Sequence, residues 1–217
     1  AQLAPLLRAH DVLLDLHSFT TPGPAFAMVG PPNNAGPREP FARAGEELQL
    51  AQCLGVAHII QGWLDVYDRA QALRGWPPDD LGVGTNEYMR SQGGIAVTLE
   101  CGQHADPAAA NVAERAVWGA LHSLQMLRMQ QMAQSASAVL PAQPVQPVRL
   151  TDVWLRHAPG AALTRAWQPF DAVSRGDALL RRADEGFCVH APADGVVVFP
   201  NGQANVGEEL LYLARRI

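Results

Sequence analysis

The sequence contains no lysine, because all sixteen of its basic residues are arginine. This absence excludes a Schiff-base lysine, a P-loop lysine and a lysine that carries a lipoyl or biotin group. Charge is also sparse: 17% of the residues are charged, and the formal net charge is −5. Such a chain has no electrostatic attraction for nucleic acid, so we expect no nucleic-acid partner.

Cysteines and long apolar runs are scarce as well. Cys53, Cys101 and Cys188 lie far apart in apolar surroundings and form no Cys-x-x-Cys motif. We therefore expect buried free thiols in a reducing compartment and no sulfur-ligated zinc. No apolar run approaches the roughly 18 residues of a membrane span, and no signal peptide is evident. The sequence thus predicts a soluble, cytoplasmic protein with no membrane partner.

The 217 residues suffice for one medium domain, or for one domain with a small appendage. The chain begins with Ala1, and residues 3–10 predict a short amphipathic helix that leads into a strand. We therefore expect the sequence to begin partway through a larger domain.

Two apolar runs predict buried parallel strands that each end in polar side chains. Residues 12–16 form the first run, and Asp15, His17 and Ser18 lie at its carboxyl end. Residues 95–102 form the second, which carries Glu100 near its end. Ligands of open α/β sheets bind outside the carboxyl ends of the strands. We therefore expect the sheet to bring His17 and Glu100 together.

The remaining pattern divides the chain into three parts. Up to residue 133 it is α/β, residues 134–147 form a linker rich in Ser, Gln and Pro, and residues 148–217 form a small all-β domain. Residues 63–83 predict an irregular lid or connecting loop. The further elements expected in the first part are short strands at 26–29 and 58–60, helices at 40–54 and 106–132, and a helical turn at 86–92.

An imidazole and a carboxylate at adjacent strand ends fit the chemistry of a zinc hydrolase. Such an enzyme needs three protein ligands, an open position for water and a carboxylate that acts as general base. Neither residue is specific alone, because a lone histidine at a strand end is more often structural than a ligand or catalyst. Glu100 is more informative, since a carboxylate that closes an apolar strand is desolvated and requires a partner.

Three motifs together resemble the succinylglutamate desuccinylase/aspartoacylase family, whose enzymes are similar in fold to zinc carboxypeptidases. They are Asp-Leu-His-Ser at 15–18, Thr-Leu-Glu-Cys-Gly at 98–102 and Val-Phe-Pro-Asn at 198–201. The resemblance extends over nearly the whole chain in order and spacing. It implies an α/β fold with a zinc-carboxypeptidase-like mixed sheet flanked by helices, truncated at its N-terminal side, and a small C-terminal all-β domain.

The resemblance also implies site residues. His17 corresponds to one ligand of a single Zn²⁺, and Glu100 corresponds to the general base. Arg90, ten residues before Glu100, corresponds to an arginine that binds a substrate carboxylate, although a solvated loop arginine is the alternative. The substrate would be an N-acyl amino acid or a related amide. His104 either borders the site or faces solvent.

The family's other two zinc ligands come from an upstream His-Gly-x-Glu type motif that this sequence lacks, and His10 cannot replace it. Two hypotheses follow. Either the chain is an inactive piece of a zinc-dependent amidohydrolase, or it is a non-catalytic binding or assembly module with a vestigial site. Missing strands would leave an open sheet edge, which predicts self-association, for example as a homo-oligomer.

Overall fold

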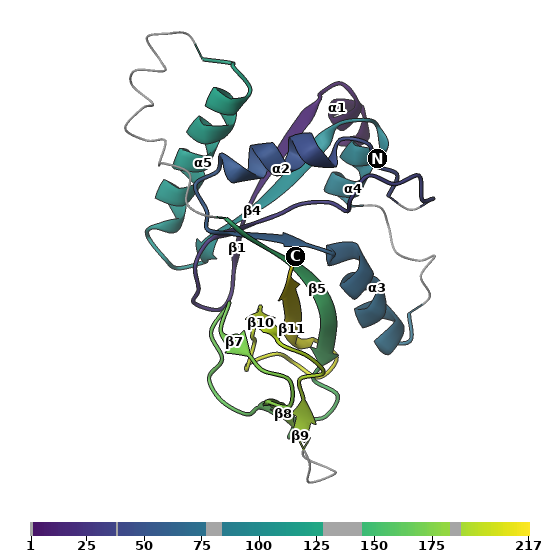
Figure 1. Cartoon of the computed structure of the whole chain (residues 1–217), viewed down its shortest axis with the longest axis vertical. Helices are drawn as coiled ribbons and strands as arrows, with labels where there is room; N and C mark the ends of the chain where they lie inside the picture. Colours follow the sequence, from purple (N-terminus) through teal and green to yellow (C-terminus); the bar gives the residue numbers. More distant parts are fainter. Residues whose placement is uncertain (1, 38, 77–83, 128–144, 183–187) are drawn as a thin grey trace. The chain divides into compact units, whose positions relative to one another are not determined.

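The computed structural model describes residues 2–37, 39–76, 84–127, 145–182 and 188–217 (Figure 1). Two compact units divide these residues. The first unit comprises the described residues of 1–19, 24–61 and 82–147, and the second comprises those of 20–23, 62–81 and 148–217. Among the described residues, no helix has the length and apolar character that a membrane span requires.

The first unit contains a mixed sheet whose strands lie in the order β1 (Val12–Phe19), β4 (Ile95–Gln103), β2 (Phe26–Met28) and β3 (His58–Gln61). β1 is parallel to β4, whereas β2 is antiparallel to β4 and parallel to β3. β4 is buried along all but its last residue, as expected for a strand covered on both faces. These strands confirm the predicted mixed sheet.

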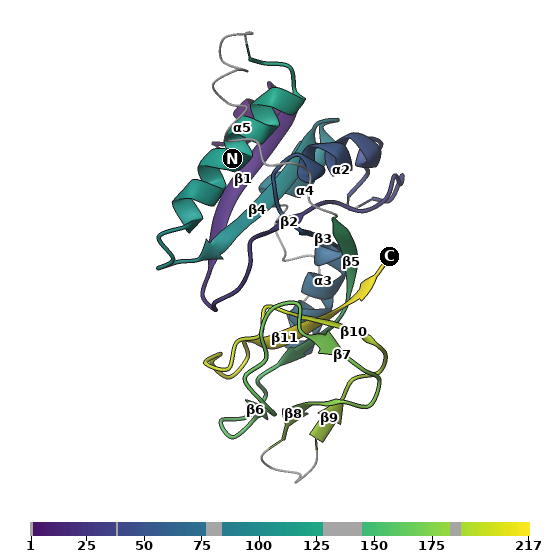
Figure 2. The ribbon, with the colours of Figure 1, turned by 60° about the vertical axis from the view of Figure 1, so that its left-hand side comes forward.

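Four helices accompany this sheet: α1 (Ala4–Arg8), α2 (Ala44–Gln52), α4 (Thr85–Ser91) and α5 (Ala109–Ser123). Figure 2 shows α5 lying along β1 and β4. Both α2 and α5 are shorter than predicted, since α2 begins at Ala44 and α5 ends at Ser123. Residues 128–132 of the predicted long helix lie outside the described residues.

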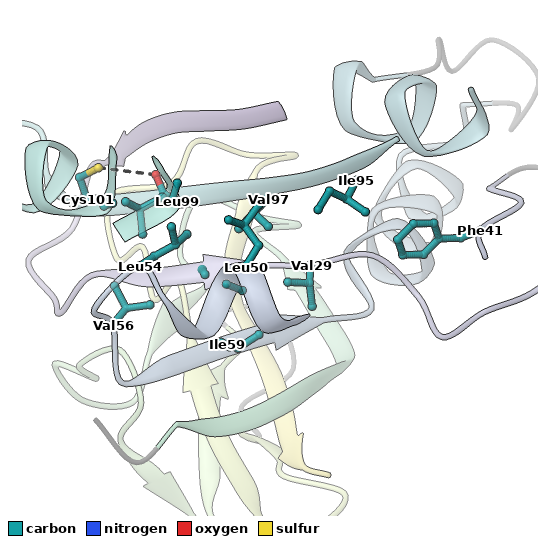
Figure 3. Close-up of a cluster of buried hydrophobic side chains, with 14 residues drawn as sticks. Val29, Phe41, Leu50, Leu54, Val56, Ile59, Ile95, Val97, Leu99 and Cys101 are labelled. Carbon is teal, nitrogen blue, oxygen red and sulfur yellow. Dashed lines mark hydrogen bonds between the residues drawn. The ribbon is translucent and has the colours of Figure 1, made fainter. Parts of the chain in front are cut away.

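The core of this unit lies on one face of β4. Alternate residues of the strand, among them Val97 and Leu99, face Leu50 and Leu54 around α2 (Figure 3). Because side chains alternate along a strand, the intervening residues point to the other face. Thr98 and Glu100 therefore lie on the face away from this core, which is the face that carries the site.

The second unit contains an antiparallel group and a separate small sheet. The antiparallel group runs in the order β5 (Gln146–Leu155), β11 (Glu209–Arg216), β10 (Gly195–Val198) and β7 (Ala172–Val173). The small sheet consists of β6 (Ala162–Leu163), β8 (Ala178–Arg181) and β9 (Cys188–His190). The β-strands expected after residue 148 are therefore present.

The second unit also contains a helix, α3 (Trp63–Leu73), so the prediction of an irregular segment there is wrong. Val66 and Ala70 are buried at helical spacing, and the Trp63 ring lies 5.7 Å from the Tyr212 ring on β11. Arg74, just after the helix, forms an ion pair with Glu209. These contacts explain why 62–76 joins the C-terminal unit, which is not all-β. Residues 77–83, and 134–144 of the predicted linker, lie outside the described residues.

Candidate functional site

The carboxyl ends of β1 and β4 bring two predicted site residues side by side. The two strands are parallel and in register from Val12 and Ile95 to His17 and Glu100, which are direct partners. Adjacent strands lie about 4.8 Å apart, and directly paired residues point to the same face. The imidazole and the carboxylate therefore share one face of the sheet.

His17 is oriented by a neighbouring carboxylate on its own strand. Its Nε2 lies 3.1 Å from Asp15 Oδ1, and its side chain is half exposed. In a neutral imidazole, an Nε2–H group can donate to this carboxylate, and that arrangement would leave the Nδ1 lone pair free. A carboxylate partner on one nitrogen is the usual arrangement for a histidine that ligates metal through the other.

Glu100 is buried without full hydrogen-bond satisfaction. It is 8% exposed, and among the described residues its Oε2 has no hydrogen-bond partner. Burial raises the pKa of Glu100, with His17 opposing the increase and Asp15 adding to it. An unpaired carboxylate oxygen is costly in the interior and calls for an explanation, such as a catalytic role or a bound water or ion.

α4 supplies further polar groups to the same face, which the sequence analysis did not identify as site residues. Asn86 donates from Nδ2 to the Thr98 hydroxyl, and Thr85 lies 3.5 Å from Asp15, the outer limit of a hydrogen bond. Of the polar residues in this network, Asp15 on β1 could be placed from the sequence, since it lies two residues before His17 and strand residues two apart share a face. Thr85 and Asn86 approach through tertiary packing and could not be placed in this way.

Arg90 lies elsewhere, in a buried group that we call the Arg90 cluster, consisting of Arg90, Glu39 and Glu47. Arg90 Nε lies 3.0 Å from Glu47 Oε2 and Nη1 lies 2.6 Å from Glu39 Oε1, while Nη2 donates to the Ala96 carbonyl. All three guanidinium nitrogens of Arg90 are bound to protein acceptors, and the residue is only 5% exposed. Its placement therefore does not support the predicted contact with a substrate carboxylate. Burial raises the pKa of Glu39, although Arg90 opposes it.

A hollow of about 390 Å³ adjoins the strand ends on the α5 side. Its lining residues are Leu16, His17, Ser18, Cys101, Ala109 and Ala113. Glu100 does not line it, because it points to the opposite face of β4 from Cys101. His17 thus borders both this hollow and the polar face that carries Glu100.

The described residues do not make a complete zinc site. They contain no group of three His, Cys, Asp or Glu side chains placed to hold a metal ion. The orientation of His17 by Asp15 suits a single ligand, whereas a tetrahedral catalytic site takes three ligands from the protein. Among the described residues, the candidates at this site are therefore one predicted ligand, His17, and one predicted base, Glu100.

No protein-family model matches the sequence, and no curated protein sequence is similar to it. Solved structures do match. The ectoine utilization protein EutE (DoeB) from Ruegeria pomeroyi aligns over 97% of this chain and 62% of its own, with a TM-score of 0.66 and 16% identity. The fold is that of the succinylglutamate desuccinylase/aspartoacylase proteins.

Two further structures of this fold support the assignment. A succinylglutamate desuccinylase from Vibrio cholerae aligns with a TM-score of 0.62 and 16% identity, over 99% of this chain and 58% of its own. A succinylglutamate desuccinylase/aspartoacylase from Rhodobacter sphaeroides aligns with a TM-score of 0.61 and 14% identity, over 99% of this chain and 61% of its own. The chain therefore spans about 60% of the length of these proteins.

Proposed function

We propose that the protein carrying this chain is a zinc-dependent hydrolase that cleaves the amide bond of an N-acyl amino acid or a related small molecule. The register of His17 with Glu100 at the ends of parallel strands carries the proposal. The shared fold supports it, because solved structures of that fold are named as succinylglutamate desuccinylases and aspartoacylases. The cytoplasmic location and the homo-oligomeric state of this protein remain predictions from the sequence.

In this proposal His17 supplies one zinc ligand through Nδ1, and Asp15 fixes the ring by accepting from Nε2. The other two ligands come from outside the described residues. A bound zinc would polarise the acyl oxygen and lower the pKa of water. One ligand holds a metal poorly, so the 217 residues alone are expected to bind zinc weakly and to be inactive.

Glu100 acts as the general base. Its buried Oε2, which has no hydrogen-bond partner in the described part of the chain, is available to accept a proton from the attacking water and to return it to the leaving nitrogen. The raised pKa of Glu100 suits this exchange, because a carboxylate with a higher pKa is a stronger base near neutral pH. Removing its charge while keeping its shape should therefore remove the chemistry.

The test is Glu100→Gln in the complete, zinc-loaded protein that carries this chain, assayed for amine release from a panel of N-acetyl and N-succinyl amino acids. We expect turnover to fall by about 10²- to 10⁴-fold, the usual contribution of a general base. Glu46→Gln is the matched control, because Glu46 is an exposed glutamate on α2 that forms a surface ion pair with Arg43. Wild-type turnover in the Glu100 variant would exclude that residue as the base.

A binding or assembly module is the second candidate, and the absence of a three-residue metal group among the described side chains favours it. The same panel separates the two. A complete, zinc-loaded wild-type protein that releases no amine from any substrate would favour the module.

A further inference from the structure

The strand pairing changes immediately after His17 and Glu100. Phe19 is the next paired residue of β1, and its partner is Gln103 on β4. One residue of β1, Ser18, therefore faces two residues of β4, Cys101 and Gly102. This is a β-bulge, a device that bends a strand and redirects side chains next to functional sites.

The bulge depends on glycine. Gly102 has a φ of 127°, a region that side chains disfavour. Space is not the constraint, because a Cβ at this position would lie 3.7 Å from Asp106, an ordinary contact distance. The backbone conformation itself therefore requires Gly102, two residues after the proposed base.

Two hydrogen bonds close the bulge on its far side. The His104 amide donates to the Phe19 carbonyl at 2.9 Å, and the Ser18 hydroxyl lies 2.8 Å from His104 Nδ1. The side-chain bond joins the residue after the proposed ligand to a residue four positions after the proposed base. Ser18 and His104 are both exposed, so their bond adds little to the buried core.

We propose that Ser18 and His104 are positioning residues, whose hydrogen bond holds the bulge and so fixes the His17 imidazole relative to the Glu100 carboxylate. This inference rests on the proposed function of that pair. An interaction that orients a ligand without touching the metal typically changes metal affinity or activity by about 10- to 100-fold. Neither residue needs to contact the substrate.

The first measurement is hydrogen exchange at the His104 amide in the full chain, which needs no activity. Ser18→Ala removes the side-chain bond, so we expect that amide to exchange about 2- to 10-fold faster, as the loss of one hydrogen bond implies. The Ile95 amide, bonded to the Asp11 carbonyl at the other end of the strand pair, should be unchanged. Ser18→Thr keeps the hydroxyl and should restore slow exchange.

The second measurement is turnover of the complete, zinc-loaded protein that carries this chain. Ser18→Ala and His104→Ala should each lower kcat by about 10-fold with KM unchanged, and the double variant should be no worse than either, because one bond is lost in all three. Ser91→Ala and His10→Ala are matched controls, since both are exposed residues with local hydrogen bonds outside the site. Both should keep full turnover.

If Ser18→Ala leaves hydrogen exchange at the His104 amide unchanged, the Ser18–His104 bond does not hold the bulge, and the proposal is overturned. If exchange becomes faster but kcat stays at the wild-type value, the bond holds the bulge without positioning His17, which also overturns the proposal. In either case an inactive Glu100→Gln leaves the proposed hydrolase standing. A fully active Glu100→Gln instead rejects the proposed base, and the positioning role falls with it.

Discussion

Glu100 should set the acid limit of activity. Burial raises its pKa above the ordinary value of 4.5, and only the charged carboxylate can accept a proton. The rate should therefore rise with pH through this raised pKa and then level off. A profile of kcat/KM against pH reports the pKa in the free enzyme. An acid limb at or below pH 4.5 would contradict the raised pKa, and Ser91→Ala should leave the profile unchanged.

The ionised carboxylate of Glu100 should lower the free energy of unfolding. Because the folded state raises its pKa, the native protein binds this proton more tightly than the unfolded chain does, so stability falls as pH rises through the raised value. Glu100→Gln cannot ionise, and we expect it to increase the free energy of unfolding at pH 8 but not at pH 4. Urea denaturation at the two pH values tests this. An equal effect at both would contradict it.

Arg90 should contribute to stability rather than to turnover. Arg90→Met would leave Glu39 and Glu47 without their buried cation, and breaking a buried pair typically costs about 3–5 kcal/mol. Arg43→Met is the control, because its partner Glu46 is exposed and the pair is a surface one. Denaturant unfolding measures both. Equal, small losses would show that the Arg90 cluster does not stabilise the fold.

Helix packing can be tested at two glycines. A Cβ on Gly119 of α5 would collide with the Cys53 carbonyl that follows α2, whereas one on Gly45 of α2 would meet nothing. Gly119→Ala should therefore destabilise by about 1–3 kcal/mol through overpacking. Gly45→Ala should stabilise by up to about 1 kcal/mol through helix propensity. Thermal unfolding of both variants is the measurement, and the same sign for both would contradict this packing.

The elements recovered from the sequence are those whose signal is local. β1 and β4 appear as continuous apolar runs because buried parallel strands need them. The helix α3 replaces part of the irregular segment expected at 63–83, and its buried residues Val66 and Ala70 have helical spacing. Periodicity over eleven residues was the better guide.

The missed parts of the site depend on partners that are distant in sequence. Arg90 pairs with carboxylates that lie 43 and 51 positions away in the sequence, and Ser18 bonds to His104, which lies 86 positions away. No spacing rule predicts such pairs. The motif around Glu100 located the carboxylate, but the β-bulge that follows it depends on how two strands come into register.

For the whole chain, the second unit should not fold from residues 148–217 alone. That piece lacks α3, whose Trp63 packs on Phe199 and Tyr212 and whose Arg69 pairs with Asp152. We expect it to unfold without a cooperative transition and to bind a hydrophobic dye, compared with the intact chain. A sharp transition at the intact chain's temperature would contradict this.

The second unit is assembled from segments made early and late in synthesis, which has a consequence for biogenesis. About 135 residues separate α3 from β11, and at 5–20 residues per second the ribosome needs roughly 7 to 27 s to make them. During that interval the nascent helix lacks the Phe199 and Tyr212 rings that pack against Trp63 in the folded unit. Chaperone capture on the ribosome should therefore centre on Trp63 and its neighbours, and end when the last strand emerges.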